Sequence, residues 1–198
     1  ILGGVIADKY IGSRWAVIVG AIIMTLGHAS MAAEGISKLW FFVGLACLVI
    51  GTGFFKPNMP SILGEMYKSL PDKKDGAYTI FYMGINSGAF LGMLLCGYIG
   101  EKVGWHYGFG LAGVFMFFGM IQFYFAQRIF GIIGEKPGTK HNPEDKLVSV
   151  QEEDHTPANV VRDRLIVVAV LMIASIFFFF AFEQAGGSMT IFAKDYTQ

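Results

Sequence analysis

A lysine and a glutamate each follow a long uncharged stretch of this sequence. Lys56 comes after seventeen uncharged residues, Leu39–Phe55, and Glu183 comes after eighteen, Leu165–Phe182. Ionisable side chains inside apolar segments are rare and usually face a partner or a water-filled cavity. Protonation of Glu183 would free Lys56 to attract another anion, so the two predict a proton-sensitive ion pair. The alternative is that both mark helix ends, where a lysine reaches the headgroups easily.

Prolines and polar side chains accompany these two groups. Pro57 and Pro60 each leave a helical carbonyl without its donor, so a kink is expected beside Lys56. Tyr82 and Asn86 are four residues apart and therefore lie on one face of a helix. They could bind the amide or terminal groups of a ligand, or they could form hydrogen bonds to a neighbouring helix, which is equally common in membranes.

Small residues recur at every fourth position of one apolar run. They are Gly84, Gly88, Gly92, Cys96 and Gly100. Such a stripe lets a neighbouring helix approach closely. It predicts either a surface along which helices slide or a tight, static packing contact.

Composition indicates that membrane-spanning helices position these residues. The 198-residue chain is 54% hydrophobic and only 15% charged, whereas a soluble domain is nearer one quarter charged. A spanning helix needs roughly 20 apolar residues. Five runs qualify, with Lys56 interrupting the second and Glu183 the last: about Trp15–Ala33, Leu39–Leu63, Gly76–Gly100, Val103–Arg128 and Leu165–Ala193. The runs are too long for strands, so we expect an all-α integral membrane protein with about five full transmembrane helices and the end of another.

Basic residues are distributed unequally between the two sets of loops. One set holds eleven lysines and arginines, and the other holds three, Lys38, Lys102 and Lys194. The positive-inside rule places the first set in the cytoplasm. That set includes the polar connection of roughly 130–163, which we expect to be a solvated linker between two groups of helices. We interpret the chain as an internal piece of a longer protein.

Other kinds of chemistry find little support in the sequence. The net charge is zero, so electrostatics makes no case for nucleic-acid binding. Cys47 and Cys96 lie in separate apolar runs without metal-ligand spacing and are expected to be small buried thiols. No nucleophile elbow or phosphate-binding loop is present, so we expect neither an enzyme nor a bound metal or cofactor.

Four segments resemble transporters. GGVIADKYIGSR resembles the loop between the second and third helices of major facilitator transporters. FFKPNMPSILGEMY, FYMGINSGAFLG and FFFAFEQAGGSMTIF together resemble the bacterial branch of the proton-coupled oligopeptide transporter family. The resemblance implies a partial major facilitator fold, from the end of helix two through helix seven. The expected parts are 1–130 from the N-terminal six-helix bundle, 131–163 as the cytoplasmic linker and 164–198 as the first helix of the C-terminal bundle.

The resemblance also implies roles for single residues. Lys56 resembles the fourth-helix lysine implicated in proton coupling and in meeting the peptide carboxylate, and Asn58 resembles an adjoining cavity residue. Tyr82 and Asn86 resemble the fifth-helix residues that contact peptide. Glu183 resembles the seventh-helix acid that responds to protonation and to peptide binding. Lys56 and Glu183 are thus the expected proton-coupling pair.

A compact charged turn precedes the first full run. On its residues alone, the turn could lock two helices at the cytoplasmic face or could be a solvated loop. Asp8 and Arg14 match the gating-loop motif of the major facilitator transporters. The resemblance therefore implies a role in gating and not in ligand binding.

Several elements that the resemblance implies are absent from this sequence. The first-helix Glu-x-x-Glu-Arg motif and helices 8–12 are missing, so the remaining helices of the same protein are expected partners. Many bacterial members carry an extra helical hairpin between helices six and seven. The connection of 131–163 is too polar to supply two further spans. This member therefore places the hairpin elsewhere or lacks it, or residues of the connection are missing from the sequence.

The function that the resemblance implies is proton-driven symport of di- and tripeptides. It would proceed by alternating access in the bacterial cytoplasmic membrane, with protons as the coupling ion and no cofactor. One alternative keeps the fold but carries nitrate or another small anionic or drug-like substrate. Another is a membrane scaffold without transport, against which the intramembrane Lys56 and Glu183 argue.

Overall fold

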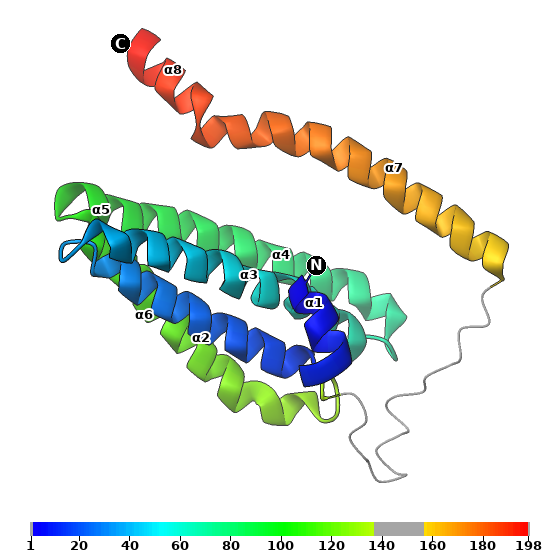
Figure 1. The fold of residues 1–198 in the computed structure, drawn as a ribbon. Coiled ribbons are helices and arrows are strands. Elements are labelled where there is room, and N and C mark those ends of the chain that lie inside the picture. The colour runs from blue at the N-terminus through cyan, green and yellow to red at the C-terminus, as the bar shows by residue number, and fades with distance from the viewer. Residues whose placement is uncertain (1, 137–156, 198) are drawn as a thin grey trace. The chain divides into compact units, whose positions relative to one another are not determined.

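The computed structural model describes residues 2–136 and 157–197, and helices dominate both ranges (Figure 1). The chain divides into two units, Ile1–Val150 and Gln151–Gln198, which are described separately below. Five helices in the described ranges are long and apolar enough to cross a membrane: Ser13–Ala32, Lys38–Met66, Pro71–Lys102, Trp105–Phe130 and Asn159–Phe182. The prediction of an all-α chain with about five transmembrane helices is confirmed.

The first unit is a bundle of antiparallel helices joined by short turns. Its α-helices are α1 (Leu2–Ile6), α2 (Ser13–Ala32), α3 (Lys38–Met66), α4 (Pro71–Gly92), α5 (Tyr98–Lys102) and α6 (Trp105–Ala126). A π-helical turn (Ala7–Ile11) precedes α2, a second (Met93–Gly97) precedes α5, and a 3₁₀ turn (Gln127–Phe130) follows α6. The second π-helical turn lies in a run predicted to be helical, whereas the first lies in the charged turn predicted before α2. Such turns insert locally into longer helices.

Local chemistry explains where several of these helices begin. The Ser37 hydroxyl accepts a hydrogen bond from the backbone N–H of Leu39 at 3.3 Å, which satisfies an orphan donor at the start of α3. Pro71 occupies the first turn of α4, where its missing N–H costs nothing. Gly12, just before α2, has φ 80°, a conformation that favours glycine. These residues fix the turns that reverse the chain.

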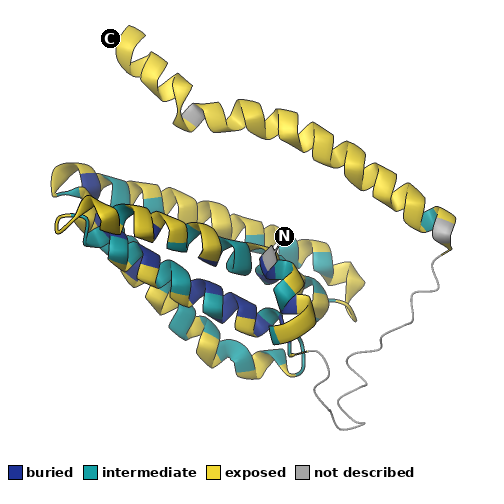
Figure 2. Ribbon diagram, in the orientation of Figure 1, coloured by how far each residue is buried: buried dark blue, intermediate teal, exposed yellow. Residues whose placement is uncertain are grey.

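The core of the first unit lies along α2. This helix packs against both α3 and α6, and Figure 2 shows buried residues along much of its length. Ala16 and Val17 are fully buried, and Ala21 is nearly so. Small side chains at these positions allow the backbones of neighbouring helices to approach, as is usual where lipid gives no hydrophobic drive to helix association.

Glycines face each other across α2 and α3. A methyl group on Gly20 would lie 2.8 Å from the Gly51 carbonyl oxygen, and one on Gly51 would lie 2.8 Å from that of Gly20. One heptad away, a methyl on Gly27 would lie 3.0 Å from the Gly44 carbonyl oxygen. Two glycine pairs, seven residues apart on each helix, thus bring these backbones together.

Within the described residues, the predicted stripe of small residues, which begins on α4, is closely packed at one end and open along the rest. Gly84, Gly88 and Gly92 have nothing from the described part of the chain within 4 Å of an added methyl group. At the far end of the stripe, a methyl on Gly108 of α6 would meet the Cys96 carbonyl at 2.6 Å and Gly100 at 3.2 Å. Close packing is therefore found at that end, and for the three glycines it stays a prediction.

The second unit contains α7 (Ala158–Phe182) and α8 (Ser188–Tyr196), joined by a 3₁₀ turn (Glu183–Gly186) and Gly187. The expected single run of Leu165–Ala193 is therefore broken at Glu183. Gly186 and Gly187 explain the break, because glycine is a poor helix former and adopts irregular conformations readily. The helix begins at Ala158, before the expected boundary at residue 164.

Candidate functional site

Lys56 lies inside α3 and not at its end. The helix runs unbroken past Pro57 and Pro60 to Met66, ten residues or about 15 Å beyond the lysine. The Lys56 side chain is exposed in the first unit. An exposed ammonium group within an apolar, membrane-length helix favours a polar partner or a ligand over a simple helix terminus. The kink expected at Pro57 and Pro60 stays a prediction.

Asn58 is buried, in contrast to the exposed Lys56 two residues earlier. It is only 2% exposed, and its side-chain amide donates a hydrogen bond to the Phe54 carbonyl at 2.6 Å. Asparagine that bonds back to the carbonyl four residues earlier serves its own helix. The structure thus gives Asn58 a local role beside the prolines, and its predicted contact with peptide remains a prediction.

Tyr82 and Asn86 share one face of α4, as their spacing predicts. Tyr82 is 57% exposed and Asn86 is exposed too. The Asn86 amide donates to the Tyr82 carbonyl at 2.9 Å, which holds the side chain against its own helix. The pair presents a phenol and a carboxamide one helical turn apart, two groups able to bind peptide amides and termini.

Glu183 stands at the break between α7 and α8, in the second unit. It is the first residue of the 3₁₀ turn, and its side chain is exposed. An open groove at this bend is lined by Ile176, Phe179, Phe180, Glu183, Gln184, Gly187 and Ser188. The helix break thus presents a carboxylate beside aromatic rings. Its pairing with Lys56 remains a prediction, as does the role of both residues in proton coupling.

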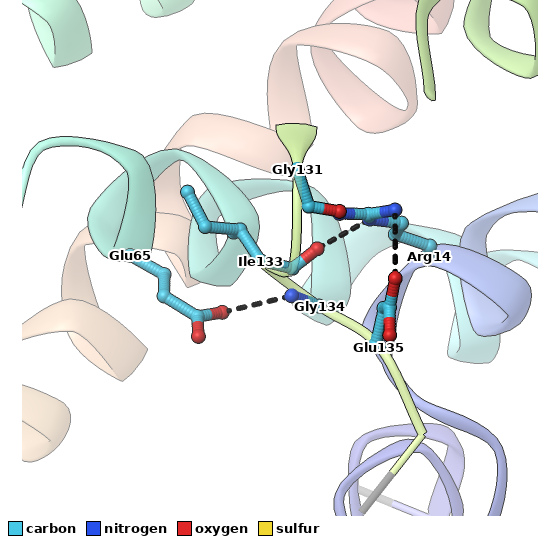
Figure 3. A network of polar contacts seen from close by, with 6 residues as sticks. All are labelled: Arg14, Glu65, Gly131, Ile133, Gly134 and Glu135. Atoms are coloured by element: carbon cyan, nitrogen blue, oxygen red, sulfur yellow. Dashed lines mark hydrogen bonds and ion pairs between the residues drawn. The ribbon is translucent and has the colours of Figure 1, made fainter. Parts of the chain in front are cut away.

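A polar cluster surrounds Arg14 at the start of α2 (Figure 3). Arg14 is only 7% exposed, and its guanidinium donates to the carbonyls of Gly131 and Ile133. It also forms an ion pair with Glu135 at 3.8 Å. The planar guanidinium suits this task because it offers several donors in a fixed fork. Arg14 thereby satisfies carbonyls of the loop that follows the last helix of the bundle.

Glu65 holds the same loop from the end of α3. Its carboxylate accepts a hydrogen bond from the backbone N–H of Gly134 at 3.2 Å, and the Gly134 carbonyl accepts from the Arg14 N–H at 3.0 Å. Residues 131–135 belong to the predicted solvated linker, yet they pack on the bundle in the structure. Glu65 was not predicted as a functional residue, although it is the lone acid near the end of its apolar run.

Asp8, the other predicted gating-loop residue, is exposed in the π-helical turn before α2. Gly12 lies between it and Arg14, and a methyl group on Gly12 would come within 2.6 Å of the Glu135 carbonyl carbon. Glycine is therefore required at position 12 for two reasons, which are the positive φ and the close approach of the 131–135 loop. A gating role for Asp8 and Arg14 stays a prediction.

Comparison with known proteins identifies the family. Residues 14–151 match the model of the POT family (PTR2). The chain belongs to the POT family. It is 33% identical to a di-/tripeptide transporter of Lactococcus lactis subsp. cremoris over 187 residues, which cover 93% of the chain and 34% of that protein. It is 29% identical to the peptide transporter YePEPT of Yersinia enterocolitica, covering 98% of the chain and 48% of the relative.

Solved structures of POT-family transporters share the fold. A mutant peptide transporter POT in complex with alafosfalin matches with a TM-score of 0.66 and 38% identity, over 87% of this chain and 34% of that one. A complex of peptide transporter POT with sulfate gives the same TM-score and identity. The partial transporter fold is confirmed, and the chain is a multi-pass membrane protein of a family of transporters, not enzymes.

The chain spans between a third and a half of the length of these relatives. The alignment to the Yersinia protein runs over 248 residues, more than the 198 of this chain, whereas that to the Lactococcus protein runs over 187. The Yersinia relative therefore contains additional residues within the aligned region. That these residues form the hairpin expected between helices six and seven stays a prediction.

Proposed function

We propose that the full-length protein is a proton-driven symporter of di- and tripeptides. The observation that carries this proposal is the POT-family match over residues 14–151, together with 33% identity to a di-/tripeptide transporter. We place the protein in the bacterial cytoplasmic membrane, with residues 131–163 on the cytoplasmic side. The excess of basic residues in that set of loops supports this orientation.

In this proposal, Lys56 binds the peptide carboxylate. A lysine within an apolar helix is costly unless an anion meets it, and a peptide's carboxylate supplies that charge. Tyr82 and Asn86 contact the peptide amide or its amino end with their hydroxyl and carboxamide groups. Asn58, which lies between Pro57 and Pro60, is a further peptide-binding residue in this proposal. The remaining helices of the protein complete the site.

Proton coupling is assigned to competition for the lysine. The ionised carboxylate of Glu183 and the carboxylate of the peptide are both anions that Lys56 can attract. Protonation of Glu183 removes its negative charge and leaves the lysine available for the peptide. The two halves of the protein then rock about the occupied site, which carries peptide and proton in the same direction.

Uptake into proteoliposomes tests the function directly. The full-length protein is reconstituted, an acidic exterior is imposed, and accumulation of labelled dialanine is measured. We expect accumulation that a protonophore abolishes and that excess unlabelled tripeptide inhibits. Lack of accumulation, or inhibition by nitrate with no effect of peptide, would contradict the proposal and favour a small-anion carrier.

A Glu183→Gln variant tests the coupling role separately. The amide mimics the protonated acid, so we expect peptide exchange to continue while its dependence on external pH flattens. The measurement is dialanine counterflow, without a pH gradient, over a series of pH values. A pH profile identical to that of the unmodified protein would remove Glu183 from the coupling scheme.

A further inference from the structure

One hydrogen bond links α4 to the proline segment of α3. The hydroxyl of Tyr78 donates to the backbone carbonyl of Pro60 at 2.9 Å. Tyr78 is half-buried and lies on α4 two turns after Pro71, where the helix begins. The bond therefore joins the two arms of a helical hairpin close to the turn between them.

Gly64 makes room for this hydrogen bond. It lies one turn after Pro60 on α3, and a methyl group there would stand 2.7 Å from the Tyr78 hydroxyl oxygen. A carbon atom that close is well inside van der Waals contact, so any larger residue would displace the hydroxyl. The absence of a side chain at Gly64 and the presence of a hydroxyl at Tyr78 are thus two halves of one contact.

The bond sets the level of α4 relative to α3. In an antiparallel hairpin, moving one turn away from the connecting turn adds four residues on one helix and subtracts four on the other. One turn beyond the Pro60–Tyr78 bond, the register places Lys56 level with Tyr82. A second turn places Asn86 level with Thr52. Lys56 and Tyr82 therefore lie one turn from this bond, and Asn86 lies two turns from it, on the side away from the connecting turn.

We propose that Tyr78 is a positioning residue for peptide binding. Its hydroxyl holds the α3–α4 register and so keeps Lys56 level with Tyr82 and one turn from Asn86. This inference rests on the proposed transport function and adds Tyr78 to the residues assigned to it. A register shift would move the lysine away from the two polar side chains without unfolding either helix.

The test compares Tyr78→Phe with Gly64→Ala in the full-length protein. Removal of one net hydrogen bond changes an equilibrium by roughly three- to tenfold. We expect each variant to raise the KM for labelled dialanine by about that factor with little change in the maximal rate. Because both changes break the same contact, the double variant should have nearly the KM of either single variant.

Thr79→Val is the matched control. The Thr79 hydroxyl bonds to the Asp75 carbonyl of its own helix at 2.9 Å, so its loss leaves the two helices joined as before. We expect an unchanged KM for this variant. A raised KM only in the variants at Tyr78 and Gly64 supports the inference, and unchanged KM values in folded, transporting Tyr78→Phe protein overturn it.

A distance measurement covers the case of lost uptake. Spin labels at Ser61 on α3 and Ile80 on α4, both exposed, report the hairpin register in purified protein. We expect Tyr78→Phe to broaden or shift their distance distribution, and an unaltered distribution would contradict the inference. If the unmodified protein takes up no dialanine, the proposed function fails, while the distance measurement still decides whether Tyr78 fixes the register.

Discussion

Glycine is used in two different ways in the first unit. Across α2 and α3, Gly20 faces Gly51 and Gly27 faces Gly44, so each backbone fills the space that a side chain would take. On α4, Gly84 and Gly88 recur just as regularly, but nothing in the described residues comes within 4 Å of a methyl group at either. The α2–α3 contact is a glycine seam, whereas the α4 stripe is an open face within the described part.

The difference shows that glycine spacing alone does not identify a packing contact. The seam needs two helices whose glycines match in antiparallel order, seven residues apart on both. The α4 face instead carries exposed Tyr82 and Asn86 beside its glycines. We therefore assign the seam to stability, whereas ligand binding by the α4 face stays a proposal.

The largest expected effect is on the seam. Gly51→Val would drive a branched side chain into Gly20, whose carbonyl oxygen lies 2.8 Å from the position of a first added carbon. Overpacking costs about 1–3 kcal/mol in ordinary cores, and a backbone that cannot retreat raises this toward loss of folding. Folded yield and thermal unfolding of the full-length protein in detergent provide the measurement.

Gly88→Val is the matched control on the α4 face. We expect a smaller loss of thermal stability than for Gly51→Val, because the described residues leave the Gly88 position open. An equal loss at both positions would show that another helix of the complete protein packs as tightly on α4. That result would show that the α2–α3 seam and the α4 face do not differ in how tightly they pack.

The next effect in size concerns the polar cluster that closes the bundle. Arg14→Ala leaves the carbonyls of Gly131 and Ile133 without their donor and separates Glu135 from its ion-pair partner. Because these hydrogen bonds are only part-buried, their loss costs about 0.5–1.5 kcal/mol each. We expect a lower melting temperature, which Arg14→Lys restores only in part because lysine lacks the fork. Unchanged melting in Arg14→Ala would deny the cluster a structural role.

The smallest effect on stability is expected on the open face. Asn86→Ala removes one exposed carboxamide, which donates a hydrogen bond to the Tyr82 carbonyl of its own helix. We expect unchanged melting but a dialanine KM raised by roughly three- to tenfold, as for the loss of one hydrogen bond. A fall in stability with an unchanged KM would instead assign Asn86 to helix packing.

Much of the fold was predictable from the sequence because lipid imposes simple rules. The apolar runs predict the five long helices, since a spanning segment must satisfy its own backbone groups. The break at Glu183 was not predicted, although Gly186 and Gly187 were visible, because hydropathy ignores backbone conformation. The glycine seam was missed for another reason, since matched glycines are recognised only when the paired helices are known.

The site residues divide in the same way. Spacing correctly predicts that Tyr82 and Asn86 share a face, because that depends only on helical period. It gives no hint that Asn58 turns back to Phe54, that Glu65 holds the Gly134 N–H, or that Tyr78 reaches Pro60. Those contacts depend on tertiary structure or on local side-chain conformation, which hydrophobic patterning does not specify.

In the proposed function, Lys56 binds the peptide carboxylate and couples this binding to the proton. Dialanine accumulation in proteoliposomes, driven by an acidic exterior, is measured for the unmodified full-length protein and for Lys56→Ala. We expect accumulation by the former and none by the latter, with equal amounts of folded protein in the membrane. Normal proton-driven accumulation by Lys56→Ala would contradict it.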